Sequence, residues 1–240
     1  MFSNSVCWSN GKSFIQFLFF YEFNIDFNHP RVYDSDSILS LEHSPRHIII
    51  YGAGVIGCEY ASIFNGLGAK VDLINPGDRL LAFMDDEISD ALSYHLRDQG
   101  VVVLHNEIFE SVQEDVGNLV VRCQSGKEIH SDLLFWANGR TGNTDGLGLE
   151  AIGIPINSRG QVEVDGHFQT SQPHIYAVGD VIGHPSLAST SLQQGRVAAC
   201  HALDTPSLPE SPWFPYGIYS VPEISTCGMS EEETQSRGIP

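Results

Sequence analysis

The sequence predicts an α/β fold in which a parallel sheet is the middle of three layers, and three observations lead to this class. An apolar, β-branched run at residues 48–51 ends at closely spaced glycines and passes directly into a helical pattern. A second run, 70–74, follows at the distance expected for a βαβ unit. A third run, 101–104, is apolar at every position, as is typical of strands that a parallel sheet covers on both faces.

The glycines after the first strand form the pattern Gly52-Ala-Gly54-Val55-Ile56-Gly57. In a Rossmann-like fold the first glycine permits a tight turn, the second lets the backbone approach a pyrophosphate, and the third lets the helix pack on the strand. The helix that begins near Val55 would turn its unpaired N–H groups and positive dipole end toward that pyrophosphate. The alternative is a turn that merely needs glycines, but the flanking strands and helix favour a dinucleotide site.

The residue after the second strand usually reads the adenine ribose, an acid for the 2′-hydroxyl of NAD and an arginine for the 2′-phosphate of NADP. Here that residue is Asn75. An uncharged amide neither repels nor requires a phosphate, so we expect tolerance of both cofactors, with Arg79 able to supply positive charge. Two alternatives stay open: residues 75–78 are only a turn, or Asp72 within the strand fills the acidic position.

Residues 84–100 predict a helix, with acids in its first turn and a glycine at its end. Its expected packing face consists of Ile88, Ala91, Leu92 and His95. The later expected elements are an antiparallel β-meander over 108–114, 118–123 and 128–130, a buried strand over 132–136, short strands over 161–164 and 175–178, a helix over 187–203, and a strand within 217–226.

Composition narrows the function classes. The formal net charge is −18 and basic residues form no run, so nucleic acid and anionic membranes are not expected partners. The five cysteines and ten histidines show no metal-ligand or disulfide spacing, and isolated cysteines favour a reducing cytosol, hence a cytoplasmic protein. An aromatic-rich run at 13–23 is too short to span a bilayer and lacks the features of a signal peptide.

Three stretches resemble one family: Y-G-A-G-V-I-G-C-E-Y-A-S-I-F at 51–64, W-A-N-G-R-T-G-N-T-D at 136–145 and H-I-Y-A-V-G-D-V-I-G at 174–183. They are similar to the two-dinucleotide flavoprotein reductases of the pyridine nucleotide-disulfide oxidoreductase family, which includes dihydrolipoamide dehydrogenase and glutathione reductase. Within it, the chain most resembles members that exchange hydride between nicotinamide cofactors. The resemblance implies an FAD-dependent oxidoreductase that transfers hydride between NADPH and NAD, and a homodimer in the full-length family.

The resemblance also assigns roles to individual residues. Glu59 matches an acid beside the nicotinamide, and Asp180 matches the aspartate that hydrogen-bonds the flavin's ribityl chain. The helix start at 187–189 would point N–H groups at the flavin ring and stabilise its reduced, anionic form. No catalytic or metal-ligating side chain is indicated. The candidate cofactor-binding residues are Gly52, Gly54, Val55, Ile56, Gly57, Glu59, Asn75, Arg79, Asn138, Gly139, Gly179, Asp180, Ala188 and Ser189.

The resemblance implies a domain order that begins with an unassigned segment, residues 1–24, which matches nothing in the family. The expected parts after it are a connecting segment at 25–46, a Rossmann-like NAD(P)H-binding domain at 47–138, part of an FAD-binding domain at 139–205, and the start of a C-terminal dimerisation domain at 206–240. No G-x-G-x-x-G for FAD precedes residue 47. We therefore expect a fragment, whose dimerisation is doubtful. The alternatives are an inactive NAD(P)H-binding fragment without flavin and a dihydrolipoamide dehydrogenase-like reductase.

Overall fold

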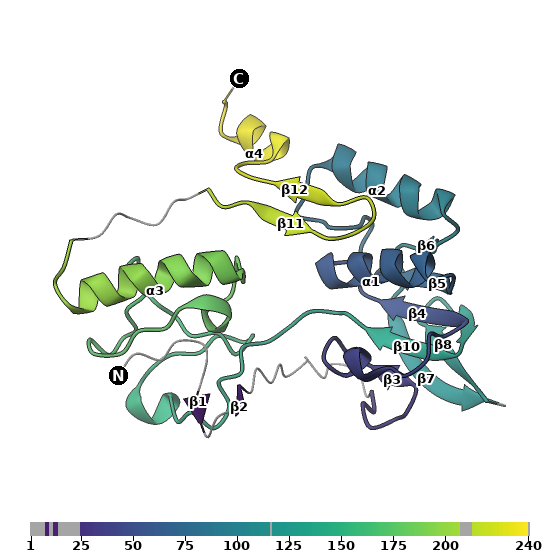
Figure 1. The fold of residues 1–240 in the computed structure, drawn as a ribbon, viewed down its shortest axis with the longest axis horizontal. Coiled ribbons are helices and arrows are strands. Elements are labelled where there is room, and N and C mark those ends of the chain that lie inside the picture. Colours follow the sequence, from purple (N-terminus) through teal and green to yellow (C-terminus); the bar gives the residue numbers. More distant parts are fainter. Residues whose placement is uncertain (1–7, 10–11, 14–24, 116, 207–212, 240) are drawn as a thin grey trace. The chain divides into compact units, whose positions relative to one another are not determined.

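The computed structural model describes residues 8–9, 12–13, 25–115, 117–206 and 213–239, and the chain divides into two compact units (Figure 1). Unit 1 contains residues 140–214 together with the described residues before position 20. Unit 2 contains residues 21–139 and 215–240. Residues 14–24, which hold most of the aromatic-rich run, lie outside the described part.

Unit 2 is built on a five-stranded sheet that is parallel throughout, in the order β3-β10-β4-β5-β6. Helix α1 (Val55–Gly66) connects β4 to β5, and α2 (Asp86–Asp98) lies between β5 and β6. The predicted α/β class is therefore confirmed. The strands are β3 (Val32–Tyr33), β4 (His47–Tyr51), β5 (Lys70–Ile74), β6 (Val102–Leu104) and β10 (Leu133–Trp136).

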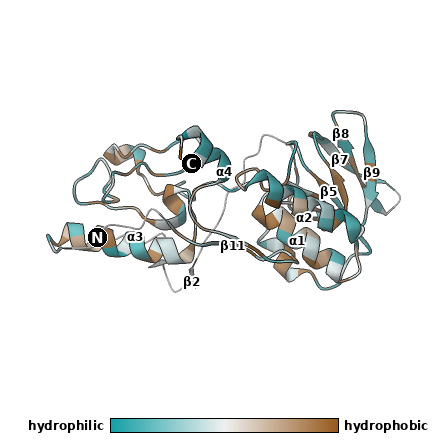
Figure 2. Cartoon of the chain, turned by 90° about the horizontal axis from the view of Figure 1, so that it is seen from above, coloured by the Kyte–Doolittle hydropathy of each residue, from teal (hydrophilic) through white to brown (hydrophobic). Residues whose placement is uncertain are grey.

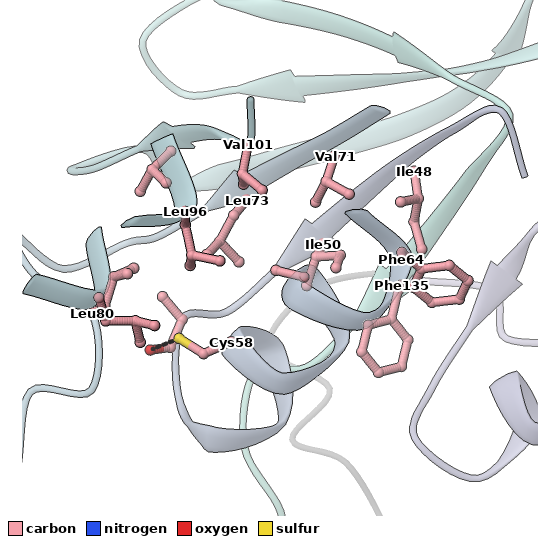
Figure 3. Packing of buried hydrophobic residues seen from close by; sticks show 14 of the residues in the cluster. Ile48, Ile50, Cys58, Phe64, Val71, Leu73, Leu80, Leu96, Val101 and Phe135 are labelled. Carbon is pink, nitrogen blue, oxygen red and sulfur yellow. Dashed lines mark hydrogen bonds between the residues drawn. The ribbon is translucent and has the colours of Figure 1, made fainter. Parts of the chain in front are cut away.

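One face of this sheet is covered by the two helices. Ile48 and Ile50 of β4 point into a core that also contains Cys58 and Phe64 of α1 and Leu96 of α2 (Figure 3). Both isoleucines are completely buried. Each such side chain stabilises the fold by about 2 kcal/mol through removal of apolar surface from water.

The opposite face of the sheet is covered by an antiparallel meander of β7 (Phe109–Asp115), β8 (Asn118–Cys123) and β9 (Glu128–Ser131). Tyr51 and Trp136 stack at 4.5 Å between ring centroids, and Phe109 of the meander meets both rings edge-on. Since side chains alternate along a strand, β4 can bury residues on both faces. The sheet is thus the middle of three layers, as predicted.

The packing face of α2 differs from the expected one. Leu92 is buried, but its buried neighbours are Ser89 and Leu96, whereas Ile88 and Ala91 are exposed and His95 is half-buried. The helix is rotated because Leu96, one turn after Leu92, enters the core beside α1. Among the described residues, no helix has the length and apolar character of a membrane-spanning segment.

Unit 1 contains α3 (Ala188–Ala202) and two short 3-10 helices, η2 (Glu150–Ile152) and η3 (Gly179–Ile182). The strands expected at 161–164 and 175–178 are only isolated bridges, Ile156 to Val162 and Gln169 to Tyr176. Both segments are partly buried, but each pairs with its partner at a single position, so no ladder forms. A short strand pair, β1 (Trp8–Ser9) and β2 (Lys12–Ser13), precedes them in the chain.

Two segments outside residues 47–138 also contribute to unit 2. The connecting segment contains strand β3 and helix η1 (Ser37–Ser40), whose Ile38 is buried in the core. The single strand expected at 217–226 is a hairpin of β11 (Tyr216–Ile218) and β12 (Ile224–Thr226), followed by α4 (Glu231–Ser236). Ile218 is completely buried in the same core, and residues 215–240 fall within unit 2.

Candidate functional site

The turn between β4 and α1 is shaped by contacts between backbone atoms. Gly52 has a φ of +109°, and a Cβ there would lie 2.5 Å from the carbonyl oxygen of Ala137. A Cβ on Gly57 would lie 1.8 Å from the carbonyl oxygen of Gly52. Both positions therefore require glycine, the first for the turn and the second for the close approach of helix to strand.

Gly54 is glycine for a different reason. It is the N-cap residue of α1, its φ of −76° suits any residue, and a Cβ there would meet nothing within 4 Å. The protein itself therefore does not exclude a side chain at this position. The open space beside an exposed backbone fits a ligand that approaches the turn, as the sequence predicted for a pyrophosphate.

The N-terminus of α1 adds hydrogen-bond donors to this space. No side chain caps the helix, no acid lies in its first turn, and the first intrahelical bond runs from the N–H of Cys58 to Gly54. The N–H groups of Val55, Ile56 and Gly57 precede that bond, as the first turn of every helix requires. Val55 and Ile56 pack partly against the core, which fixes the donors in place.

Glu59 lies in the second turn of α1 and is held by the C-terminal hairpin. Its Oε1 atom accepts a hydrogen bond of 2.8 Å from the N–H of Tyr219. Close by, Ser62 Oγ accepts a bond of 3.2 Å from the N–H of Val221. Sequence reasoning missed this contact, because nothing in the local pattern links the helix to residues so far along the chain.

Asn75 follows β5, and its amide is used within its own loop. Nδ2 donates to the carbonyl oxygen of Arg79 at 2.8 Å and lies 3.1 Å from His105 Nδ1, while Oδ1 accepts from the N–H of Gly77 at 3.0 Å. Burial, with Arg97 as a second cause, lowers the pKa of His105, so its neutral ring can accept from Asn75. The structure thus favours the alternative in which these residues form a turn.

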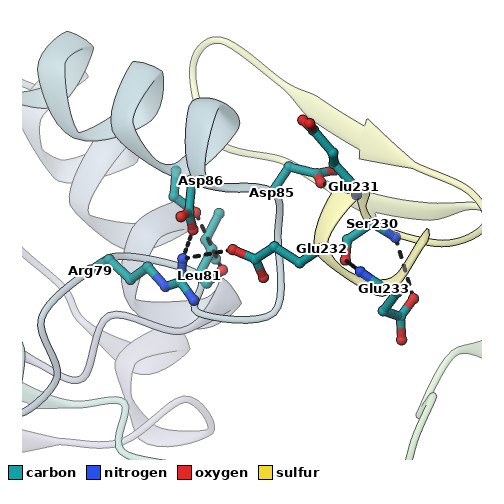
Figure 4. A network of polar contacts seen from close by, with 9 residues as sticks. Arg79, Leu81, Asp85, Asp86, Ser230, Glu231, Glu232 and Glu233 are labelled. Atoms are coloured by element: carbon teal, nitrogen blue, oxygen red, sulfur yellow. Dashed lines mark hydrogen bonds and ion pairs between the residues drawn. The ribbon is translucent and has the colours of Figure 1, made fainter. Parts of the chain in front are cut away.

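Arg79 and Asp72 are both occupied by protein partners. The guanidinium of Arg79 forms ion pairs with Asp86 and, at 3.7 Å, with Glu232 (Figure 4). The buried Asp72 lies within β5 and pairs with His47 at 2.9 Å. Asp72 is therefore part of the sheet interior rather than the acid that reads a ribose.

The expected flavin residues lie in unit 1. Gly179 has a φ of +76°, and its N–H donates to Oε1 of the buried Gln194 at 2.8 Å. The carboxylate of Asp180, which follows, has no hydrogen-bond partner among the described residues of the chain. Sequence reasoning missed Gln194, although a polar side chain between Thr190 and Val197 on the buried face of α3 was a signal.

Helix α3 of the same unit begins without a side-chain cap. Leu187 is its N-cap residue, and Ala188 and Ser189 in its first turn are exposed. Unit 1 therefore contains a carboxylate that can accept hydrogen bonds and helix N–H groups that can donate them. Asn138 and Gly139 are exposed after β10, and the boundary between the units falls directly after Gly139.

Cys58 has no chemical role at this site. It is buried on α1, its Sγ lies 3.5 Å from the carbonyl oxygen of Ala53, and burial followed by the charge of Glu59 raises its pKa to about 12. The thiolate is therefore not populated near neutral pH.

Comparison with known proteins shows the family to which this chain is similar. The family described as pyridine nucleotide-disulphide oxidoreductase matches residues 23–195. Proteins named soluble pyridine nucleotide transhydrogenase from Pseudomonas paraeruginosa and Hahella chejuensis are each 58% identical over 217 residues, which is 90% of this chain and 47% of theirs. The chain thus spans about half the length of the curated relatives it matches.

Solved structures show the same fold. The HOCl-induced flavoprotein disulfide reductase RclA from Escherichia coli is 32% identical with a TM-score of 0.81, over 86% of this chain and 48% of that one. LpdA from Mycobacterium tuberculosis is 28% identical with a TM-score of 0.82, over 88% and 46%. The chain belongs to the pyridine nucleotide-disulphide oxidoreductase family.

Proposed function

We propose that this chain supplies the NAD(P)H site and part of the FAD site of a soluble pyridine nucleotide transhydrogenase, which transfers hydride between NADPH and NAD. The observation that carries the proposal is the glycine turn, where Gly52 and Gly57 are required by packing and Gly54 leaves space for a ligand. The 58% identity to proteins of that name supports the activity over a disulfide reductase, since the reductase RclA is 32% identical.

In this proposal the first turn of α1 binds the nicotinamide dinucleotide. The N–H groups of Val55, Ile56 and Gly57 donate to the pyrophosphate, and the helix dipole stabilises its charge. Gly54 lets the phosphates approach the backbone. Glu59, fixed by the Tyr219 N–H, lies one turn further along the helix toward the nicotinamide end.

Unit 1 holds the flavin in the same proposal. Asp180 accepts hydrogen bonds from ribityl hydroxyls, and the N–H groups at Ala188 and Ser189 stabilise negative charge on the ring. Asn138 and Gly139 form the exit of the nucleotide domain. The bound flavin and nicotinamides supply the hydride chemistry, so the residues of the chain act by binding and orientation rather than as acid or base.

Further parts of the proposal rest on the family. For the full-length protein we propose a homodimer in the cytoplasm, and the name of the relatives, soluble pyridine nucleotide transhydrogenase, supports nicotinamide nucleotides as small-molecule partners. The acidic composition, with a formal net charge of −18, disfavours nucleic acid and anionic membranes as partners.

The visible spectrum of the purified chain tests the proposal. We expect flavin absorbance that bleaches when NADH or NADPH is added without oxygen, and recovers when the oxidised form of the other nucleotide follows. A colourless chain that gains thermal stability from either nucleotide would limit the function to NAD(P)H binding. A colourless chain that neither nucleotide stabilises would contradict both parts of the proposal.

A further inference from the structure

We propose that Glu232, on the short C-terminal helix α4, sets the choice between NADH and NADPH by occupying Arg79. This inference rests on the proposed NAD(P)H site. It concerns a residue far along the chain from the nucleotide-binding motif, which no local pattern connects to the cofactor.

Arg79 lies where a 2′-phosphate would need positive charge. It is four positions after Asn75, at the end of β5, where this fold places the ribose of the dinucleotide. It is the only basic residue between Lys70 and His95. Its carbonyl oxygen is fixed by Asn75 Nδ2, and its side chain is one-third exposed, so the guanidinium is accessible at a defined position.

Two carboxylates compete for this guanidinium. Asp86 comes from the first turn of α2, and Glu232 approaches from α4, with Oε1 3.7 Å from the Arg79 nitrogen (Figure 4). Exposed ion pairs of this kind are weak. The Glu232 contact can therefore exchange with a stronger anion, and it acts as a competitor rather than as a permanent block.

The position of Glu232 is fixed by its neighbours. Asp85 Oδ1 accepts a hydrogen bond of 2.6 Å from the N–H of Glu231, and Ser230 and Glu233 form a reciprocal capping box at the start of α4. This helix is hydrophilic along its length (Figure 2) and buries no side chain. Polar contacts at its first turn hold α4 to the rest of unit 2. The same turn places Glu232 beside Arg79.

Charge then discriminates between the two cofactors. NADPH brings a phosphate of about −1.5 to −2 charges, which must displace Glu232 and approach Asp86, the other carboxylate paired with Arg79. NADH brings a hydroxyl at that position, which needs no cation. Glu232 therefore lowers the affinity for NADPH and leaves that for NADH unchanged.

The test is a fluorescence titration of NADH and NADPH against the full chain, Glu232→Gln and Glu231→Gln at low salt. Glu231→Gln is the matched control, because it makes the same charge change on the same helix and its carboxylate contacts Gln235 instead of Arg79. We expect Glu232→Gln to bind NADPH about fivefold more tightly, a change typical of one surface charge pair, and NADH as the parent does. Glu231→Gln should leave the ratio of the two affinities unchanged.

A double variant, Glu232→Gln with Arg79→Gln, shows whether the effect passes through Arg79. We expect it to lose the gain in NADPH affinity. Three results would overturn the inference: an unchanged affinity ratio in Glu232→Gln, an equal shift of the ratio in Glu231→Gln, or a gain in NADPH affinity that survives in the double variant. In each case NADH binding by the parent chain would still uphold the proposed site. A parent chain that binds neither nucleotide would overturn both.

Discussion

Strands β4 and β5 are neighbours in one sheet, yet different forces shape the loops at their carboxyl ends. The β4–α1 turn is determined by backbone atoms of Gly52, Gly57 and Ala137 that leave no space for a Cβ. The loop after β5 is determined by side chains, with Asn75 bonded to His105 and Arg79 paired with Glu232. A steric requirement is visible in a local motif, whereas the partner of a charged side chain depends on the whole fold.

The largest effect is expected at the steric contact. Gly57→Ala would place a Cβ 1.8 Å from the Gly52 carbonyl oxygen, so helix α1 must move away from β4. We expect the free energy of unfolding to fall by about 3 kcal/mol or more. Urea denaturation followed by circular dichroism measures it, and a loss below about 1 kcal/mol would show that the turn adapts.

The second prediction concerns the side-chain loop. Asn75→Ala removes the hydrogen bonds to Arg79, Gly77 and His105 at a buried position, and we expect a loss of about 2 kcal/mol. Thermal unfolding measures the change. A loss below about 0.5 kcal/mol would show that the loop keeps its shape without the Asn75 side chain.

The third prediction separates binding from stability within the glycine turn. Gly54→Ala adds a Cβ that meets no protein atom, so the unfolding free energy should change by less than about 1 kcal/mol. The same Cβ lies in the space proposed for the pyrophosphate, and we expect NADH to bind about tenfold more weakly. Differential scanning fluorimetry and an NADH titration on the same sample check both. Unchanged affinity would place the pyrophosphate elsewhere.

The smallest expected effect is a pH dependence of the stability that Glu107 contributes. Hydrogen bonds from Lys127 and then from Ser125 lower the pKa of Glu107 from its ordinary 4.5, although burial opposes them. The native state therefore binds this proton less readily than the unfolded chain does. The stabilisation is complete above pH 4.5 and disappears as the pH falls through the lower, folded-state pKa.

The variant Glu107→Gln checks this sign. Its deficit in unfolding temperature relative to the parent should be present at neutral pH and shrink below about pH 4.5. A deficit that is the same at both pH values would mean that Glu107 stabilises the fold without its charge.

Periodicity and glycine spacing predicted much of unit 2 and less of unit 1. The bounds expected for β5 are those observed, and α1 begins at the expected Val55. In unit 1 the segments at 161–164 and 175–178 have strand-like sequences but form single bridges, because a strand requires a partner along its length and not only its own pattern. Buried polar residues such as Gln194 are equally invisible to an apolar pattern.

By itself the sequence determined the parallel sheet and its glycine turn, because these depend on continuous apolar runs and on local sterics, and it indicated the family by the resemblance of residues 51–64, 136–145 and 174–183. Only the tertiary structure decided that Asn75 is used within its loop, that Glu59 is held by Tyr219 and that Arg79 is paired with Glu232. The physical reason is that each of these polar groups takes the partner that folding brings within reach. For Glu59 and Arg79 that partner lies on the C-terminal segment, far along the chain.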